Sequence, residues 1–186
     1  MRKPVQNIND AAQDAPASAE ASPDVMDAVT GLRPDDPVYG IRHGREKVAV
    51  AMQKNYDVFF DPQSRGLGLA ERLLVALYAS VLSRSAPLRA HYEQALNALD
   101  VEDGIRRAVL DDAPGSLADG RLRVILEFTR KLIVKPVEGD AAAIRQLEAA
   151  GLAMPDIVTL AQLVAFLSYQ IRVAAGLIAM KELASQ

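Results

Sequence analysis

The side chains best suited to catalysis or metal binding are few in this sequence of 186 residues, which has two histidines and no cysteine. Without a thiol, the sequence offers no disulfide, no thiolate metal site and no thiol nucleophile. His43 and His91 lie far apart, and neither has a carboxylate four residues later, where a helical metal ligand would stand. The sequence therefore predicts no metal site and no cofactor.

One arginine and two tyrosines are candidate ligand-binding residues. Arg172 lies inside an apolar segment, and a buried guanidinium requires a carboxylate, free helix carbonyls or a bound anion as its partner. Either an ion pair at a subunit contact or a bound ligand would meet this need. Tyr78 and Tyr169 are candidates for lining a pocket, although aromatic residues at helical spacing also belong in a core.

The composition favours an all-α protein that binds neither nucleic acid nor membranes. Hydrophobic residues make up 50% of the chain and aromatic residues only 5%, so the core must consist mainly of Ala, Leu, Val and Ile. Such a mixture favours helices packed closely on helices. The net charge of −3 offers no basic footprint for nucleic acid or an anionic membrane.

The chain divides into a tail and one helical domain. Residues 1–24 are rich in Ala, Pro, Asp and Ser, with too little apolar surface to repay ordering, so we expect a disordered tail. The start lacks the apolar stretch of a secretory signal, which favours a cytoplasmic location. Residues 25–186 are expected to form a single domain of about seven helices.

Two segments of this domain are apolar on nearly every side. The segment 69–82 is expected to be a central buried helix, and 156–180 is long enough to raise the question of a membrane span. Gln162, Gln170 and Arg172 interrupt the second segment, so a core or interface helix explains it better. Because both helices carry more apolar surface than a small bundle can hide, we expect a homo-oligomer.

A further helix is predicted to run without a break from about residue 38 to residue 60. Arg42 and His43 belong to a polar stretch of this helix that is expected to face solvent. Val48 and Val50 are expected to face the core.

Three stretches carry a resemblance to a known family. They are LGLAERLLVALYASVLSRSAPLRAHYEQAL, DGRLRVILEFTRKLIVKP and IRQLEAAGLAMPDIVTLAQLVAFLSYQIRVAAGL. In this order they resemble the core hairpin, the following helix and the closing helix pair of the alkylhydroperoxidase-D-like and carboxymuconolactone-decarboxylase superfamily, particularly its peroxidase-related branch. The resemblance covers most of residues 69–178. It implies an alkylhydroperoxidase-D-like helical bundle that assembles from dimers or trimers.

The peroxidase branch of this family depends on a C-x-x-C pair with a histidine and a glutamate. When Ser80 is matched to the family's small helical residue, the two cysteine positions become Ser85 and Leu88. In the same register the histidine position becomes Tyr92 and the glutamate position becomes Leu73. A serine hydroxyl forms neither a sulfenic acid nor a disulfide, so the resemblance implies a member without dithiol peroxidase activity.

The decarboxylase branch needs no cysteine, and Leu88 to His91 resemble its histidine turn. This resemblance implies that His91 acts as a general acid or base, with Glu71 on the antiparallel helix as the nearby carboxylate. The other interpretation is that His91 is a hydrogen-bonded histidine between two helices.

Two functions are therefore predicted. The first is a pseudoenzyme, a binding or assembly protein that associates with itself or with a cysteine-bearing relative. The alternative is a thiol-independent lyase or isomerase that acts on a small carboxylate through His91, with Glu71 and Arg172 in support.

Overall fold

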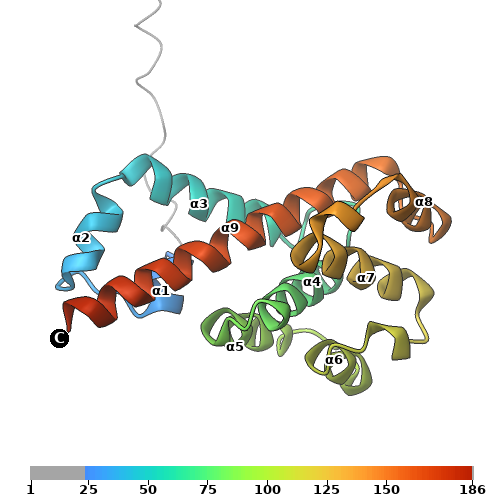
Figure 1. The fold of residues 1–186 in the computed structure, drawn as a ribbon, viewed down its shortest axis with the longest axis horizontal. Helices are drawn as coiled ribbons and strands as arrows, with labels where there is room; N and C mark the ends of the chain where they lie inside the picture. The colour runs from blue at the N-terminus through green and yellow to red at the C-terminus, as the bar shows by residue number, and fades with distance from the viewer. Residues whose placement is uncertain (1–23, 186) are drawn as a thin grey trace, which may run out of the picture.

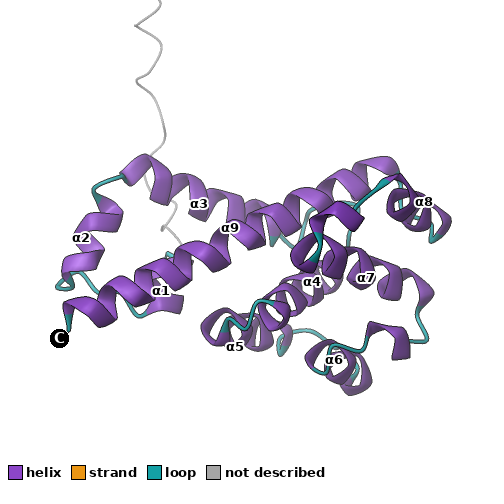
Figure 2. Cartoon of the chain, in the orientation of Figure 1, coloured by secondary structure: helices purple, strands orange, loops and turns teal. Residues whose placement is uncertain are grey.

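Helices are the only regular elements in residues 24–185, the part of the chain that the computed structural model describes (Figure 2), and this confirms the predicted all-α class. The predicted tail lies outside the described residues except for Asp24, whose carboxylate accepts hydrogen bonds from the amides of Met26 and Asp27 in α1. The elements are α1 (Val25–Thr30), α2 (Pro37–His43), α3 (Glu46–Phe59), α4 (Leu69–Leu82), α5 (Ala86–Leu96), α6 (Asp103–Leu110), η1 (Pro114–Ser116), α7 (Gly120–Val134), η2 (Pro136–Glu138), α8 (Ala141–Ala149) and α9 (Met154–Ala184).

The longest helix, α9, runs along the whole molecule and joins its two halves (Figure 1). It contacts α1 and α2 near its C-terminal end and α4, α7 and α8 elsewhere. By length and composition α9 could also cross a membrane, with a mean hydropathy of 1.7 over its most apolar stretch. Nine of its 31 residues are buried by the rest of the chain, so one side of α9 contributes to the core.

The centre of the core is α4, which has the bounds predicted for the buried helix at 69–82. It packs against α5, α6, α7 and α9, and all its residues from Arg72 to Ser80 are buried. Helix α5 returns antiparallel to α4 after a tight turn at Arg84, whose φ is 54°.

The prediction of one continuous helix at 38–60 is wrong. It is divided into α2 and α3 at Gly44, whose amide donates to the carbonyl of Gly40. The backbone of glycine loses more conformational freedom in a helix than that of any other residue, which costs about 1 kcal/mol relative to alanine. As a result Val48 and Val50 are exposed, and α3 instead buries Ala49.

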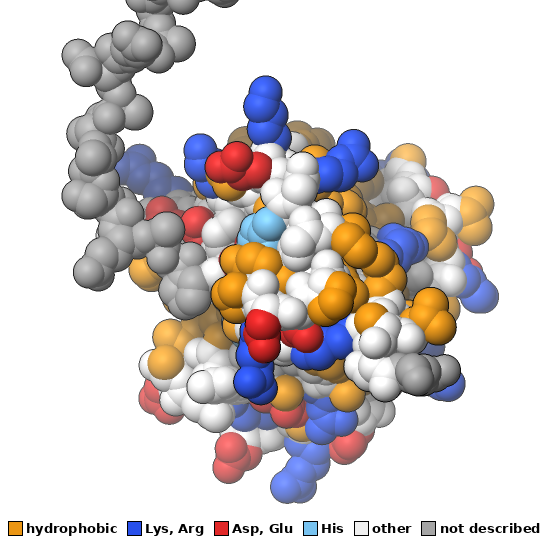
Figure 3. Space-filling view, turned by 90° about the vertical axis from the view of Figure 1, so that its left-hand side faces the viewer, with side chains coloured by type: hydrophobic (Ala, Val, Ile, Leu, Met, Phe, Trp, Pro, Cys, Tyr) orange, Lys and Arg blue, Asp and Glu red, His pale blue; other side chains and the backbone are white. Residues whose placement is uncertain are grey.

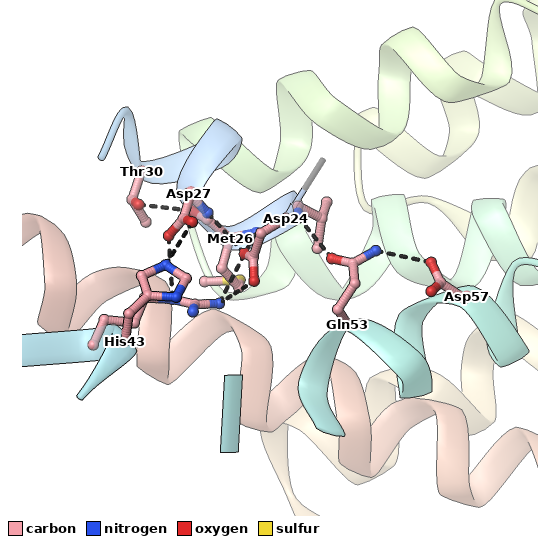
Figure 4. Close-up of polar contacts among 9 residues, drawn as sticks. Asp24, Met26, Asp27, Thr30, His43, Gln53 and Asp57 are labelled. Carbon is pink, nitrogen blue, oxygen red and sulfur yellow. Dashed lines mark hydrogen bonds and ion pairs between the residues drawn. The ribbon is translucent and has the colours of Figure 1, made fainter. Parts of the chain in front are cut away.

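The structure corrects the solvent-facing positions predicted for Arg42 and His43, whose side chains turn toward α1. Arg42 is only 6% exposed, and its Nη2 lies 2.8 Å from Oδ1 of Asp24. His43 Nε2 lies 2.8 Å from Oδ2 of Asp27 (Figure 4). These pairs tie α2 to α1 (Figure 4), so the charges hold the fold together at the end of the molecule that carries the C-terminus.

Candidate functional site

His91 lies on α5 and is half-buried among aromatic rings. Its Nε2 shares a hydrogen bond of 2.8 Å with the hydroxyl of Tyr56 on α3. Burial lowers the pKa of the His91 imidazole and raises the pKa of the Tyr56 hydroxyl to about 12. Both groups are therefore neutral at pH 7, and the imidazole holds α5 against α3.

A second polar pair lies beside His91 and is wholly buried. The hydroxyl of Tyr92 donates to Oε1 of Gln170 on α9 at 2.5 Å. The amide nitrogen Nε2 of Gln170 has no hydrogen-bond partner among the described residues. Phe60 packs against Tyr92 with ring centroids 5.4 Å apart, so the pair joins α5 to α9 within an apolar setting.

Glu71, the predicted partner of His91, is engaged elsewhere. It lies in the first turn of α4, where Oε2 accepts a hydrogen bond of 2.8 Å from the Gly68 amide. Its Oε1 lies 2.9 Å from Nε of Arg121 on α7. Among residues 24–185 no hydrogen bond or ion pair joins Glu71 to His91, and the catalytic pair is not assembled in this structure.

The three predicted ligand-binding residues do not converge on one pocket. Arg172 is exposed, contrary to the expected buried guanidinium, and its Nη1 donates to the carbonyl of Ser168 one turn earlier. Tyr169 is 43% exposed on the same helix. Tyr78 is buried, and its hydroxyl donates at 2.5 Å to the carboxylate of Asp112, which also pairs with Arg130. Tyr78 therefore holds the loop after α6 against α4.

The two positions that match the lost redox pair differ in their surroundings. Ser85 is the residue before α5, where its amide donates to the carbonyl of Ser80 at 2.9 Å. It borders a shallow hollow between the start of α5 and α9. Leu88 is completely buried, so the second position contributes to core packing.

No group of three His, Cys, Asp or Glu side chains gathers within residues 24–185 in a way that could hold a metal ion. One of the concave sites is a groove of about 680 Å³, which we call the α3–α9 groove. It lies between the C-terminal half of α3, the loop at 61–68 and the N-terminal half of α9. Its lining residues are Asn55, Val58, Phe59, Ser64, Arg65, Arg72, Thr159, Gln162, Ala165, Phe166 and Tyr169.

Arg72 in this groove is a functional candidate that the sequence analysis missed. It is 3% exposed, although it belongs to a helix otherwise made of apolar and small residues over its buried stretch. Its guanidinium donates to the backbone carbonyls of Phe59, Asp61 and Gly68. The available signal was an arginine within the most apolar predicted helix, the same signal that drew attention to Arg172.

Comparisons with known proteins show the fold. No family model matches the sequence, and no curated protein matches it. Among solved structures, the chain is similar to an uncharacterized peroxidase-related protein from Silicibacter sp. TM1040, with a TM-score of 0.64 and 21% sequence identity. The match covers 71% of this chain and 69% of that protein. The helices are therefore arranged as in a peroxidase-related protein, which agrees with the resemblance at the level of fold.

Proposed function

We propose that this chain is a peroxidase-related member of the alkylhydroperoxidase-D-like superfamily that has lost its redox centre and works as a non-catalytic assembly protein. The observation that carries this proposal is an apolar surface at one end of the molecule, which suits association with a second copy. The absence of cysteine and the likeness in fold support it.

The apolar end surface consists of Ile41, Val48, Val50, Met180 and Leu183, which are 41–72% exposed. They come from α2, the first turns of α3 and the last turns of α9, all at the same end of the molecule. Seen from this end, hydrophobic side chains gather in the middle and charged ones lie around them (Figure 3). An apolar centre with a polar rim is typical of subunit interfaces.

The alternative, a lyase that acts on a small carboxylate, has less support from the geometry. Its acid-base pair, His91 and Glu71, makes separate structural contacts with Tyr56 and Arg121. Arg172, the residue expected to help bind the carboxylate, bonds only to its own helix in the described structure.

Light scattering after size-exclusion chromatography tests the proposed assembly. We expect the purified chain to elute as a dimer or trimer, and the double variant Ile41→Glu with Leu183→Glu to elute as a monomer. Two buried carboxylates in an interface would weaken association by at least about 100-fold. The control is Val137→Glu, which places the same charge at an apolar residue that is 88% exposed on η2 and outside the apolar end surface.

If the wild-type chain stays monomeric at about 100 μM, self-assembly is overturned, because even a dimer of weak affinity would form at that protein concentration. That result would favour a cysteine-bearing relative as the partner. An assembly that the double variant leaves intact would show that a different surface is used.

A further inference from the structure

We propose that the α3–α9 groove is a binding site for a small organic carboxylate with an apolar body. In this site Arg72 and Arg65 supply positive charge, and the rings beside them receive the apolar part. The site is separate from the apolar end surface and does not depend on self-assembly.

The charge of Arg72 is the first reason. Its side chain is buried, yet no carboxylate of residues 24–185 lies within ion-pair distance of it. Three carbonyl oxygens accept its hydrogen bonds but leave the positive charge without a counter-ion. Burial lowers the pKa of this guanidinium, since the charged form is desolvated. A buried cation of this kind is stabilised when an anion binds nearby.

The two carboxylates that act on Arg72 from a distance are already engaged. Glu71 is held by Arg121 and by the Gly68 amide. Asp61 accepts a hydrogen bond from the amide of Gln63. Both carboxylates favour the charged form of Arg72 from a distance, but neither contacts it.

The lining of the groove is the second reason, and it favours an anion over a cation. Two arginines and no aspartate or glutamate line it, although the whole chain carries a net charge of −3. Arg65 is exposed on the loop. Polar side chains of the rim, such as Asn55 and Gln162, offer further hydrogen bonds to a carboxylate.

The apolar part of the groove determines the rest of the ligand. Phe59 and Phe166 pack with ring centroids 5.3 Å apart. Val58 and Tyr169, which are 66% and 43% exposed, extend this apolar lining. A groove of about 680 Å³ has the size of an ordinary small-molecule site, in which apolar walls surround a few polar groups. A carboxylate on a ring or a short branched chain fits this combination.

Titration of the ¹⁵N-labelled full chain with sodium benzoate, followed by NMR, tests the proposal. We expect saturable shifts of the amides of Arg65, Thr159 and Gln162. Benzamide has the same shape without the charge, and acetate has the charge without the ring. Each should bind at least about tenfold more weakly than benzoate, the effect of losing one charge-assisted hydrogen bond or one ring contact.

Two variants locate the binding in the groove. Arg65→Gln should weaken benzoate binding about tenfold, since it removes the exposed cation of the groove. Ala165→Trp should abolish binding, because this exposed alanine lines the groove and a large ring there would fill it. The matched control is Arg145→Gln, the same change of charge at an exposed residue of α8, which should leave the affinity unchanged.

The proposal is overturned by any of three results. The first is that no saturable shift occurs up to roughly 10 mM benzoate, a concentration at which even a weak site would respond. The second is that benzoate and benzamide bind equally well. The third is that Arg65→Gln and Arg145→Gln weaken benzoate binding equally.

Discussion

Helices α4 and α9 are both apolar around most of their circumference, yet the fold treats them differently. Every consecutive residue of α4 from Arg72 to Ser80 is buried, because α5, α6, α7 and α9 enclose this helix. In α9 the buried residues recur at helical spacing from Ile157 to Leu177, and exposed residues lie between them. Apolar composition therefore shows that a helix must be buried against another surface, but it does not show which surface buries it.

The uncovered side of α9 is where both proposals lie. Tyr169 and Ala165 line the α3–α9 groove, and Met180 and Leu183 belong to the apolar end surface. A helix of 31 residues extends beyond what its neighbours in this chain can enclose. Its outer side is therefore available for a ligand and for a second subunit.

The largest difference is expected between equal truncations in the two helices. Leu77→Ala removes a side chain that is 1% exposed on α4, and should lower the free energy of unfolding by about 2–5 kcal/mol. Leu183→Ala, at a residue that is 72% exposed on α9, should change it by less than about 0.5 kcal/mol in the monomer. Urea denaturation at low protein concentration measures both, and equal losses would contradict the comparison.

A smaller effect is expected at the polar contact on the inner side of α9. Tyr92→Phe removes the hydroxyl that bonds to Gln170 and leaves a buried amide without a partner, at a cost of about 1–3 kcal/mol. Tyr169→Phe makes the same chemical change on the outer side and should cost almost nothing. Addition of Gln170→Leu to Tyr92→Phe should recover part of the loss, and a further loss would show that the amide has another role.

The smallest expected effect depends on pH. Burial lowers the pKa of His91 in the folded protein below the ordinary value of 6.5, so the unfolded chain takes up this proton first as the pH falls. The free energy of unfolding should therefore keep its full value above pH 6.5. Below that pH it should decline by at most about 1.4 kcal/mol per pH unit.

Thermal unfolding between pH 7.5 and pH 5 measures this loss. His91→Asn should flatten the decline, because asparagine can accept a hydrogen bond from Tyr56 without titrating. The control, His43→Gln, should retain the decline due to His91. Identical pH profiles for wild type and His91→Asn would show that His91 does not cause it.

Local sequence signals predicted several elements well. The apolar run at 69–82 predicted the bounds of α4. Gly151, with a φ of 85°, follows α8 in the left-handed conformation that glycine favours, and the Leu152 amide donates to the carbonyl of Leu147. These signals depend only on neighbouring residues.

The candidate site was less predictable, because burial depends on what packs against a helix. Arg172 and Arg72 have the same sequence signal, an arginine in an apolar helix. The fold exposes Arg172 on the uncovered side of α9 and buries Arg72 among the carbonyls of the loop after α3. Nothing in either segment distinguishes the two outcomes.

The sequence by itself determined the all-α class and excluded thiol chemistry within these 186 residues, since helical periodicity and the absence of a residue type need no tertiary contact. Only the tertiary structure decided that Glu71 binds Arg121 and that His91 binds Tyr56. The same holds for the α3–α9 groove, which brings together residues 55–72 and residues 159–169. Their meeting depends on how the helices pack, and that is a property of the whole chain.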